Sequence, residues 1–149
     1  MQDLEIAKTK LKEREFTLVF VKQGKILFET KSPSMSGFLQ AIERLGERLT
    51  ESSVADKVVG RAAALLCVYS RIAAVFAMVM SRDGREVLEK YNVRYQFEKL
   101  VPNILDTQRA GICPFEKFAS TIVNPGQAYQ KLKSFADHQS SLNSVCLAH

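Results

Sequence analysis

The chain is poor in the side chains that bind zinc or form nucleophilic pairs. Its 149 residues include three cysteines, two histidines and no tryptophan. A catalytic zinc site generally needs three protein ligands, drawn mainly from His, Cys and carboxylates. Cys67, Cys113 and Cys146 are far apart and form no CxxC motif. We therefore expect no metal and no other cofactor, and free thiols in a reducing compartment rather than a disulfide framework.

Two further absences narrow the chemistry. The histidines, His138 and His149, lie in or next to the C-terminal tail. Neither a Ser-His-Asp triad nor a Cys-His pair is therefore indicated. No GxxxxGK(S/T) or GxGxxG sequence occurs, so a phosphate-binding loop has no support. If the protein is an enzyme, we expect it not to depend on zinc.

The chain also lacks a long hydrophobic run. The most apolar stretch, residues 58–80, is interrupted by Arg61 and Arg71, whereas a membrane-spanning helix needs about 20 apolar residues. No apolar core follows the first five residues, as it would in a signal peptide. We expect no membrane partner, and we expect the protein to reside in the cytoplasm.

Charge of one sign is not concentrated anywhere. The net charge is +5, but Glu13 lies within the densest basic run, at residues 8–14. Proteins that bind nucleic acids usually gather basic residues on one face, so nucleic acid is not the favoured partner. Since 46% of the residues are hydrophobic, the chain can bury a core of its own. We expect a single domain at residues 1–137 and a flexible tail at 138–149.

Helical and strand-like patterns alternate along the chain. Leu4, Ala7 and Leu11 have helical spacing, and two β-rich runs flank a turn at residues 23–24. The expected elements are a helix at 3–14, a hairpin at 17–22 and 25–30, a loop at 32–37, a helix at 38–49, a helix at 53–69, a buried parallel strand at 72–80, a helix at 84–91, a half-exposed strand at 93–98, a loop at 101–112, and helices that start at 114 and 125. This order predicts an α/β fold of three αβα layers around a mixed sheet.

A site in such a fold is expected at the carboxyl ends of the parallel strands, beside helix N-termini. Three segments can meet there: the expected helix start at Ser53, the turn after Met80, and the loop before Pro114. They supply the candidate catalytic residues Asp56 and Cys113 and the candidate ligand-binding residues Lys57, Arg82, Asp83, Arg109 and Glu116.

Each catalytic candidate also has a structural interpretation. Ser53 followed by Asp56 is typical of a capped helix start, and Asp56 is alternatively a general base or a ligand contact. Cys113 precedes a helix start, where a thiol pKa falls and the thiolate is favoured, but a packed or capping cysteine gives the same pattern. Glu116 is alternatively a carboxylate that favours a helix start. Cys67 lies among Leu and Val and is expected in the core.

Two segments resemble a known family. They are residues 53–66, SVADKVVGRAAALL, and residues 100–117, which contain LVP and GICPFEK. Together with the opening DLEIA and the hairpin, they resemble a prokaryotic family of unknown function that is placed in the cytidine-deaminase-like fold. The resemblance covers about residues 2–135. It implies that fold for this chain, and it implies no settled activity.

The zinc motifs of deaminases are missing from this sequence. Zinc deaminases begin one helix with His or Cys, any residue and Glu, and the helix after the next strand with Pro-Cys-x-x-Cys. The expected positions here read Val54-Ala55-Asp56 and, from 81 to 84, SRDG. The resemblance therefore implies the fold without the metal, with a pocket in the same place and a nucleobase-like or nucleotide-like ligand.

Two functions follow from these patterns. The first is a small-molecule-binding domain, with or without metal-independent catalysis, whose pocket is lined by Asp56, Lys57, Cys113 and Glu116. The alternative is a catalytically inactive interaction module that retains the fold, with its contact at residues 60–64 or at the hairpin edge. A homo-oligomer is compatible with both.

Overall fold

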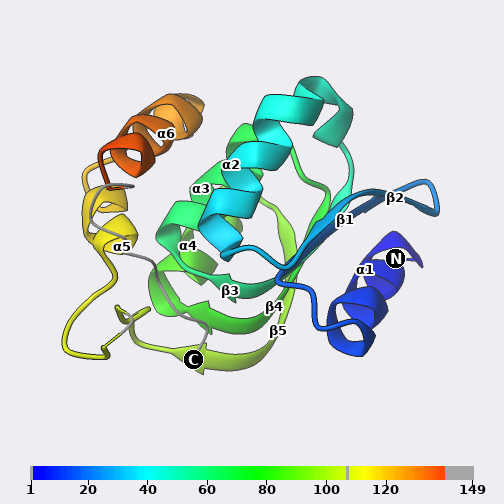
Figure 1. Cartoon of the computed structure of the whole chain (residues 1–149), viewed down its shortest axis with the longest axis horizontal. Helices are drawn as coiled ribbons and strands as arrows, with labels where there is room; N and C mark the ends of the chain where they lie inside the picture. Colours follow the sequence, from blue (N-terminus) through cyan, green and yellow to red (C-terminus); the bar gives the residue numbers. More distant parts are fainter. Residues whose placement is uncertain (1, 107, 140–149) are drawn as a thin grey trace.

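The computed structural model describes residues 2–106 and 108–139, which form one five-stranded sheet with helices on both faces (Figure 1). The strand order is β2-β1-β3-β4-β5, with β1 antiparallel to its two neighbours and β3, β4 and β5 parallel. The strands are β1 (Leu18–Lys22), β2 (Lys25–Thr30), β3 (Ser53–Val59), β4 (Ala74–Ser81) and β5 (Arg94–Val101).

The helices divide unequally between the two faces of the sheet. Helix α1 (Gln2–Glu13) covers one face, and the other helices pack on the opposite face (Figure 1). These are α2 (Ser34–Leu45), η1 (Gly46–Leu49), α3 (Arg61–Tyr69), α4 (Arg82–Lys90), α5 (Pro114–Ala119), η2 (Pro125–Gln127) and α6 (Ala128–Gln139). The predicted three-layer αβα arrangement with a mixed sheet is therefore confirmed.

Two apolar clusters hold the layers together. On the first face, Leu4, Ala7 and Leu11 of α1 pack against Val19 and Phe76 of the sheet. The larger cluster lies under the other helices and contains Phe20, whose ring meets that of Phe38 edge-on at 5.2 Å. Full burial of side chains of this size contributes roughly 1.5–3 kcal/mol each, so both layers have a substantial hydrophobic basis.

Several predicted elements are confirmed. The first helix, the hairpin, the buried strand β4, the edge strand β5 and the helix start at Pro114 all lie where the sequence placed them. Gln23 and Gly24 have positive φ at the hairpin turn, and their N–H groups donate to the Asp3 carboxylate at 2.9 and 2.8 Å. Asn124 caps the last helical segment by accepting from the N–H of Gly126 at 2.9 Å.

The predicted helix start at Ser53 is wrong. Residues 53–59 form β3, the middle strand of the sheet, and the helix begins only at Arg61. Ser53 and Asp56 imitate a helix start locally, but Val54, Val58 and Val59 favour a strand. Pairing with β1 on one side and β4 on the other satisfies the backbone of this segment, and those long-range contacts decide the outcome.

The predicted loop at residues 32–37 is too long. Helix α2 already begins at Ser34, four residues before the expected start at Phe38. Ser32, Pro33 and Ser34 are residue types that are common in loops, so the sequence did not indicate a helix start there. The second predicted loop agrees better with the structure. Of residues 102–113, all but Thr107 are described, and they contain no helix or strand apart from an isolated bridge between Leu105 and Ile112.

Three further predictions concern an interaction surface, the C-terminal tail and membrane-spanning segments. The prediction that residues 60–64 of α3 form an interaction surface is wrong, because Ala62 and Ala64 are fully buried in the core. The predicted tail falls mostly on residues 140–149, which lie outside the described part, and His138 belongs to α6. Among the described residues, no helix is both long and apolar enough to span a membrane.

Candidate functional site

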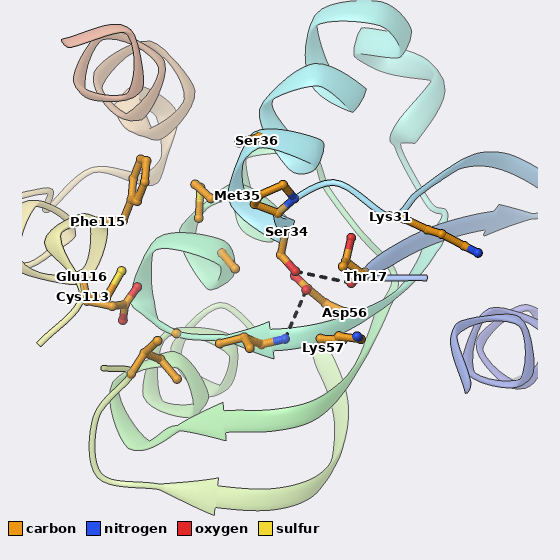
Figure 2. A pocket seen from close by; sticks show the side chains of 15 residues that line it. Thr17, Lys31, Ser34, Met35, Ser36, Asp56, Lys57, Cys113, Phe115 and Glu116 are labelled. Carbon is orange, nitrogen blue, oxygen red and sulfur yellow. Dashed lines mark hydrogen bonds between the residues drawn. The ribbon is translucent and has the colours of Figure 1, made fainter. Parts of the chain in front are cut away.

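A cavity of about 350 Å³ lies on the helical face of the sheet, beside the end of β3 (Figure 2). Its walls are contributed by β3, the first turn of α2, the start of α3, the loop before α5, and α5 itself. Apolar side chains supply much of the lining, namely Met35, Val58, Ala63, Ile104 and Phe115. Polar groups reach it at two places, around Asp56 and around Glu116 (Figure 2).

Asp56 is a carboxyl group in the middle strand of the sheet. The whole of Asp56 is buried, with no solvent-exposed surface. Alternation along β3 directs it to the same face as Val54 and Val58, where the cavity lies. Its Oδ1 accepts from the N–H of Val58 at 3.2 Å. Its Oδ2 has no hydrogen-bond partner within residues 2–106 and 108–139, so one oxygen of a buried carboxyl is left for another group.

Burial raises the pKa of Asp56 from 3.8 to about 7. The Ser34 hydroxyl and the backbone N–H groups of Val58 and Lys57 oppose this rise, but burial prevails. The hydroxyl of Ser34 has one proton, which points to the carbonyl of Thr17 at 3.4 Å. It can support the Asp56 carboxylate only by turning away from Thr17. The charged form of Asp56 is therefore poorly compensated.

Glu116 is the second carboxyl of the cavity, and its surroundings are the opposite. Its Oε1 accepts from the N–H of Arg61 at 2.7 Å, and its Oε2 accepts from the N–H of Ala62 at 3.0 Å. It thus caps the start of α3 from α5, where Gly60 at the N-cap position has no side chain to do so. Burial raises the pKa of Glu116, the two amides lower it, and Asp83 adds a further rise.

Gly60 makes this cap possible. A Cβ atom at position 60 would lie 2.3–2.7 Å from the carboxylate atoms of Glu116. Arg61 strengthens the same junction, because its guanidinium donates to the carbonyls of Ala119 at 2.9 Å and Ile122 at 2.7 Å. Four hydrogen bonds therefore join the start of α3 to α5 and to Ile122 just after it, two through Glu116 and two through Arg61.

The structure brings together only some of the predicted site residues. Asp56, Lys57, Cys113 and Glu116 line the main cavity. Asp83 lies in a neighbouring cavity of about 190 Å³ that it shares with Glu116, and Arg109 lines a separate hollow of about 340 Å³. Arg82 is exposed in the first turn of α4.

Lys57 follows Asp56 on the same strand, so the two side chains point to opposite faces of the sheet. Ala55, on the Lys57 face, packs in the cluster under α1. The Lys57 N–H donates to the carbonyl of Thr17 at 3.0 Å, which holds β3 to β1. Lys57 therefore borders the cavity through its place on the strand, while its ammonium group is directed toward the α1 side.

The expectation of free thiols holds for Cys67 and is wrong for Cys113. Cys67 is a free, fully buried thiol whose pKa is raised well above its ordinary value by burial and then by Asp56. Cys113 is disulfide-bonded, so its sulfur does not titrate as a thiol. Cys113 is buried before α5 and gives that helix no side-chain cap. We assign it no chemical step.

Sequence reasoning missed the first turn of α2. Ser34 and Met35 line the cavity, and Ser34 lies directly above the Asp56 carboxyl (Figure 2). The segment looked like a loop because of its Ser-Pro-Ser beginning. The signal that could have revealed it is the helical spacing of Met35, Leu39 and Ile42.

No group of three or more His, Cys, Asp or Glu residues positioned to hold a metal ion was found among the described residues.

Comparisons with known proteins identify a family. Residues 6–136 match the family described as a domain of unknown function, DUF1893. The crystal structure of a DUF1893 family protein (TM1506) from Thermotoga maritima is similar, with a TM-score of 0.82 and 23% identity over 90% of each chain. The chain therefore belongs to the DUF1893 family, which confirms the expected membership of a family of unknown function. No curated protein is detectably similar to it.

A second solved structure is more distant. The dCMP deaminase from the cyanophage S-TIM5, in apo form, matches with a TM-score of 0.47 and 14% identity over 67% of this chain and 94% of that chain. At this level of similarity we take no fold, activity or site from it.

The comparison of Val54-Ala55-Asp56 with the first deaminase motif was wrong. Those residues lie on a strand, and the helix after β3 begins at Arg61, with Gly60 as its N-cap residue. At the second position the sequence placed a helix start after the next strand, and α4 does begin there, with Ser81 as its N-cap residue.

Proposed function

We propose that this protein is a small-molecule-binding domain whose ligand fills the main cavity and bonds to Asp56. The observation that carries the proposal is the Oδ2 atom of Asp56: it is buried and has no partner in the described chain, and Asp56 is one of the residues that line the cavity. An unpaired buried polar group costs about 1–3 kcal/mol, and more when charged. A ligand that donates a hydrogen bond to Oδ2 would recover that free energy.

The rest of the cavity supports the same function. Ligand pockets typically measure about 300–1,000 Å³ and combine apolar walls with a few placed polar groups. The cavity of about 350 Å³ has this composition and suits a compact molecule. A nucleobase-like ligand, the class that the sequence resemblance implied, would offer ring N–H donors to Asp56 and a flat face to the apolar walls.

Metal-independent catalysis would use the same carboxyl. A general acid or base works best when its pKa lies near the working pH, and the pKa of Asp56 is about 7. Asp56 is therefore the group that would exchange a proton with a bound substrate. We also propose a cytoplasmic location and a small molecule rather than nucleic acid as the partner, in keeping with the composition of the chain.

Native mass spectrometry of the freshly purified protein, followed by thermal-shift screening of a metabolite library, tests the proposal. We expect a retained mass or a stabilising compound for the wild type, and loss of both in Asp56→Ala. The matched control is Ser70→Ala, because the Ser70 hydroxyl is also buried and unpartnered among the described residues but lies outside the cavity. Ligand binding that survives in Asp56→Ala would contradict the proposal.

A further inference from the structure

The first turn of α2 presents unused hydrogen-bond donors to the cavity. Helix α2 has twelve residues, its N-cap residue Pro33 makes no side-chain cap, and its first turn contains no acidic residue. Pro33, Ser34, Met35 and Ser36 line the cavity. The first N–H bonded in this region is that of Gly37, which donates to the carbonyl of Pro33 at 2.9 Å.

Three N–H groups, those of Ser34, Met35 and Ser36, have no acceptor within the described residues. Free N–H groups at a helix start, together with the helix dipole, favour an anion. The chain itself illustrates this preference across the same cavity, where the carboxylate of Glu116 binds the corresponding groups at the start of α3. The start of α2 therefore has the donors for a carboxylate, and the described chain supplies none.

An unused acceptor lies beside these donors. The Asp56 carboxyl is fully buried, and the Ser34 hydroxyl is near enough to influence its ionisation. Figure 2 shows the carboxyl directly below Ser34. The Oδ2 atom has no partner in the described chain. One end of the cavity thus holds an unsatisfied acceptor that is negative when ionised, next to unsatisfied donors that favour a negative group.

We propose that the cavity binds a free α-amino acid with an apolar side chain, its ammonium group on Asp56 and its carboxylate on the first turn of α2. This inference rests on the proposed function, since it specifies the ligand of the same cavity. An α-amino acid carries both charges on groups attached to one carbon atom, which matches an acceptor and donors that lie side by side.

Neither charge alone satisfies this end of the cavity. A simple carboxylate would fill the α2 start but would lie against the Asp56 carboxyl and leave Oδ2 without a donor. A simple amine would pair with Asp56 but leave the three N–H groups unused.

The opposite wall of the cavity determines which side chain of the amino-acid ligand fits. Ile104 and Phe115 are buried apolar residues, and Met35 is partly buried beside them. At that end, both oxygens of Glu116 are already engaged by the α3 amides, and the surrounding wall is apolar. We therefore expect branched or long apolar side chains, such as that of leucine, to be preferred over charged ones.

Isothermal titration with leucine and two truncated analogues tests the inference on the unaltered protein. The analogues are 4-methylpentanoate, which lacks the ammonium group, and 3-methylbutylamine, which lacks the carboxylate. We expect leucine to bind and each analogue to bind at least tenfold more weakly. Equal binding of either analogue would overturn the inference, because it would show that one of the two groups is not recognised.

Two variants locate the binding. Asp56→Ala removes the partner of the ammonium group, and Pro33→Asp places a carboxylate at the start of α2, where it competes with that of the ligand. Each is expected to weaken leucine binding at least tenfold, while Ser70→Ala leaves it unchanged. Unchanged leucine affinity in Pro33→Asp, with the melting temperature showing a folded protein, would contradict the assignment of the carboxylate.

Titrations with the twenty common amino acids, with nucleobases and nucleoside monophosphates, and with the metabolite library separate this inference from the proposed function. If none of the twenty common amino acids binds but a nucleobase or nucleoside monophosphate does so in an Asp56-dependent manner, the amino-acid assignment is wrong and the proposed function stands. If neither the amino acids nor the metabolite library binds the wild type, both are wrong.

Discussion

Two helices begin at the same cavity, and the chain treats their N-termini differently. At α3, Glu116 occupies the N–H groups of Arg61 and Ala62, and Gly60 leaves room for it. At α2, no side chain caps the first turn, and the nearby Asp56 keeps one oxygen without a partner among the described residues. A carboxylate whose hydrogen bonds are complete stabilises the fold, whereas one left incomplete beside a cavity is available to a ligand.

The largest expected effect concerns the ionisation of Asp56. Its pKa is 3.8 when unfolded and about 7 when folded. The folded state therefore holds the proton more strongly, so stability falls as pH rises from about 4 to about 7. The gap corresponds to on the order of 4 kcal/mol. Asp56→Asn cannot ionise, so the stability difference between wild type and variant should change by that order between pH 4 and pH 8.

Urea denaturation of both proteins at several pH values measures this difference. Parallel stability curves for wild type and Asp56→Asn would show that Asp56 ionises normally in the folded protein, and the contrast with Glu116 would disappear.

The next effect is the loss of the α3 cap. Glu116→Ala leaves two N–H groups at the start of α3 without their charged acceptor, and hydrogen bonds to charged groups contribute about 1.5–3 kcal/mol. We expect the free energy of unfolding to fall by about 3 kcal/mol in urea denaturation. Glu86→Ala is the matched control, because Glu86 is exposed on α4, and it should change stability by less than about 0.5 kcal/mol.

A smaller effect comes from the space that Gly60 leaves. Its φ of −103° suits any residue, so the cost of Gly60→Ala comes from the close approach of its Cβ to Glu116. We expect a loss of about 2 kcal/mol. The same substitution in the Glu116→Ala background should cost much less, because the obstructed carboxylate is gone. A double-mutant cycle in which the two losses simply add would reject this explanation.

The smallest effect is a gain. Pro33→Asp supplies the cap that α2 lacks, and a capping side chain is worth about 1 kcal/mol. The variant should therefore unfold at a higher urea concentration than both wild type and Pro33→Ala. A variant no more stable than Pro33→Ala would indicate that the first-turn N–H groups of α2 are already satisfied.

The architecture was largely predictable from the sequence because most elements carry a local pattern. Leu4, Ala7 and Leu11 define α1 by their spacing, and the alternation of Tyr95 and Phe97 with polar residues identifies the edge strand β5. The segment at residues 53–59 was not predictable in this way, since its local helix-start signal conflicts with its β-branched residues and only sheet pairing resolves the conflict.

The candidate site was predictable in some of its residues and not in their roles. Asp56 and Glu116 were named from their polarity near expected helix starts, and both line the cavity. The helix start that Glu116 caps lies 55 residues earlier in the chain, so no local pattern reveals it. A helix cap was one of two interpretations of Asp56, and it is wrong because Asp56 lies on a strand. The unpartnered oxygen that Asp56 has among the described residues depends on the packing of β3, α2 and α3.

The most direct test of the central claim is a carbon-13 NMR titration of the Asp56 carboxyl, assigned by comparison with Asp56→Asn. The structure predicts a pKa of about 7 for this carboxyl in the free protein, and a lower pKa once a ligand donates to Oδ2. A carboxyl that titrates near its ordinary value of 3.8, with or without ligand, would contradict the account, because Asp56 would then have the partners that the structure denies it.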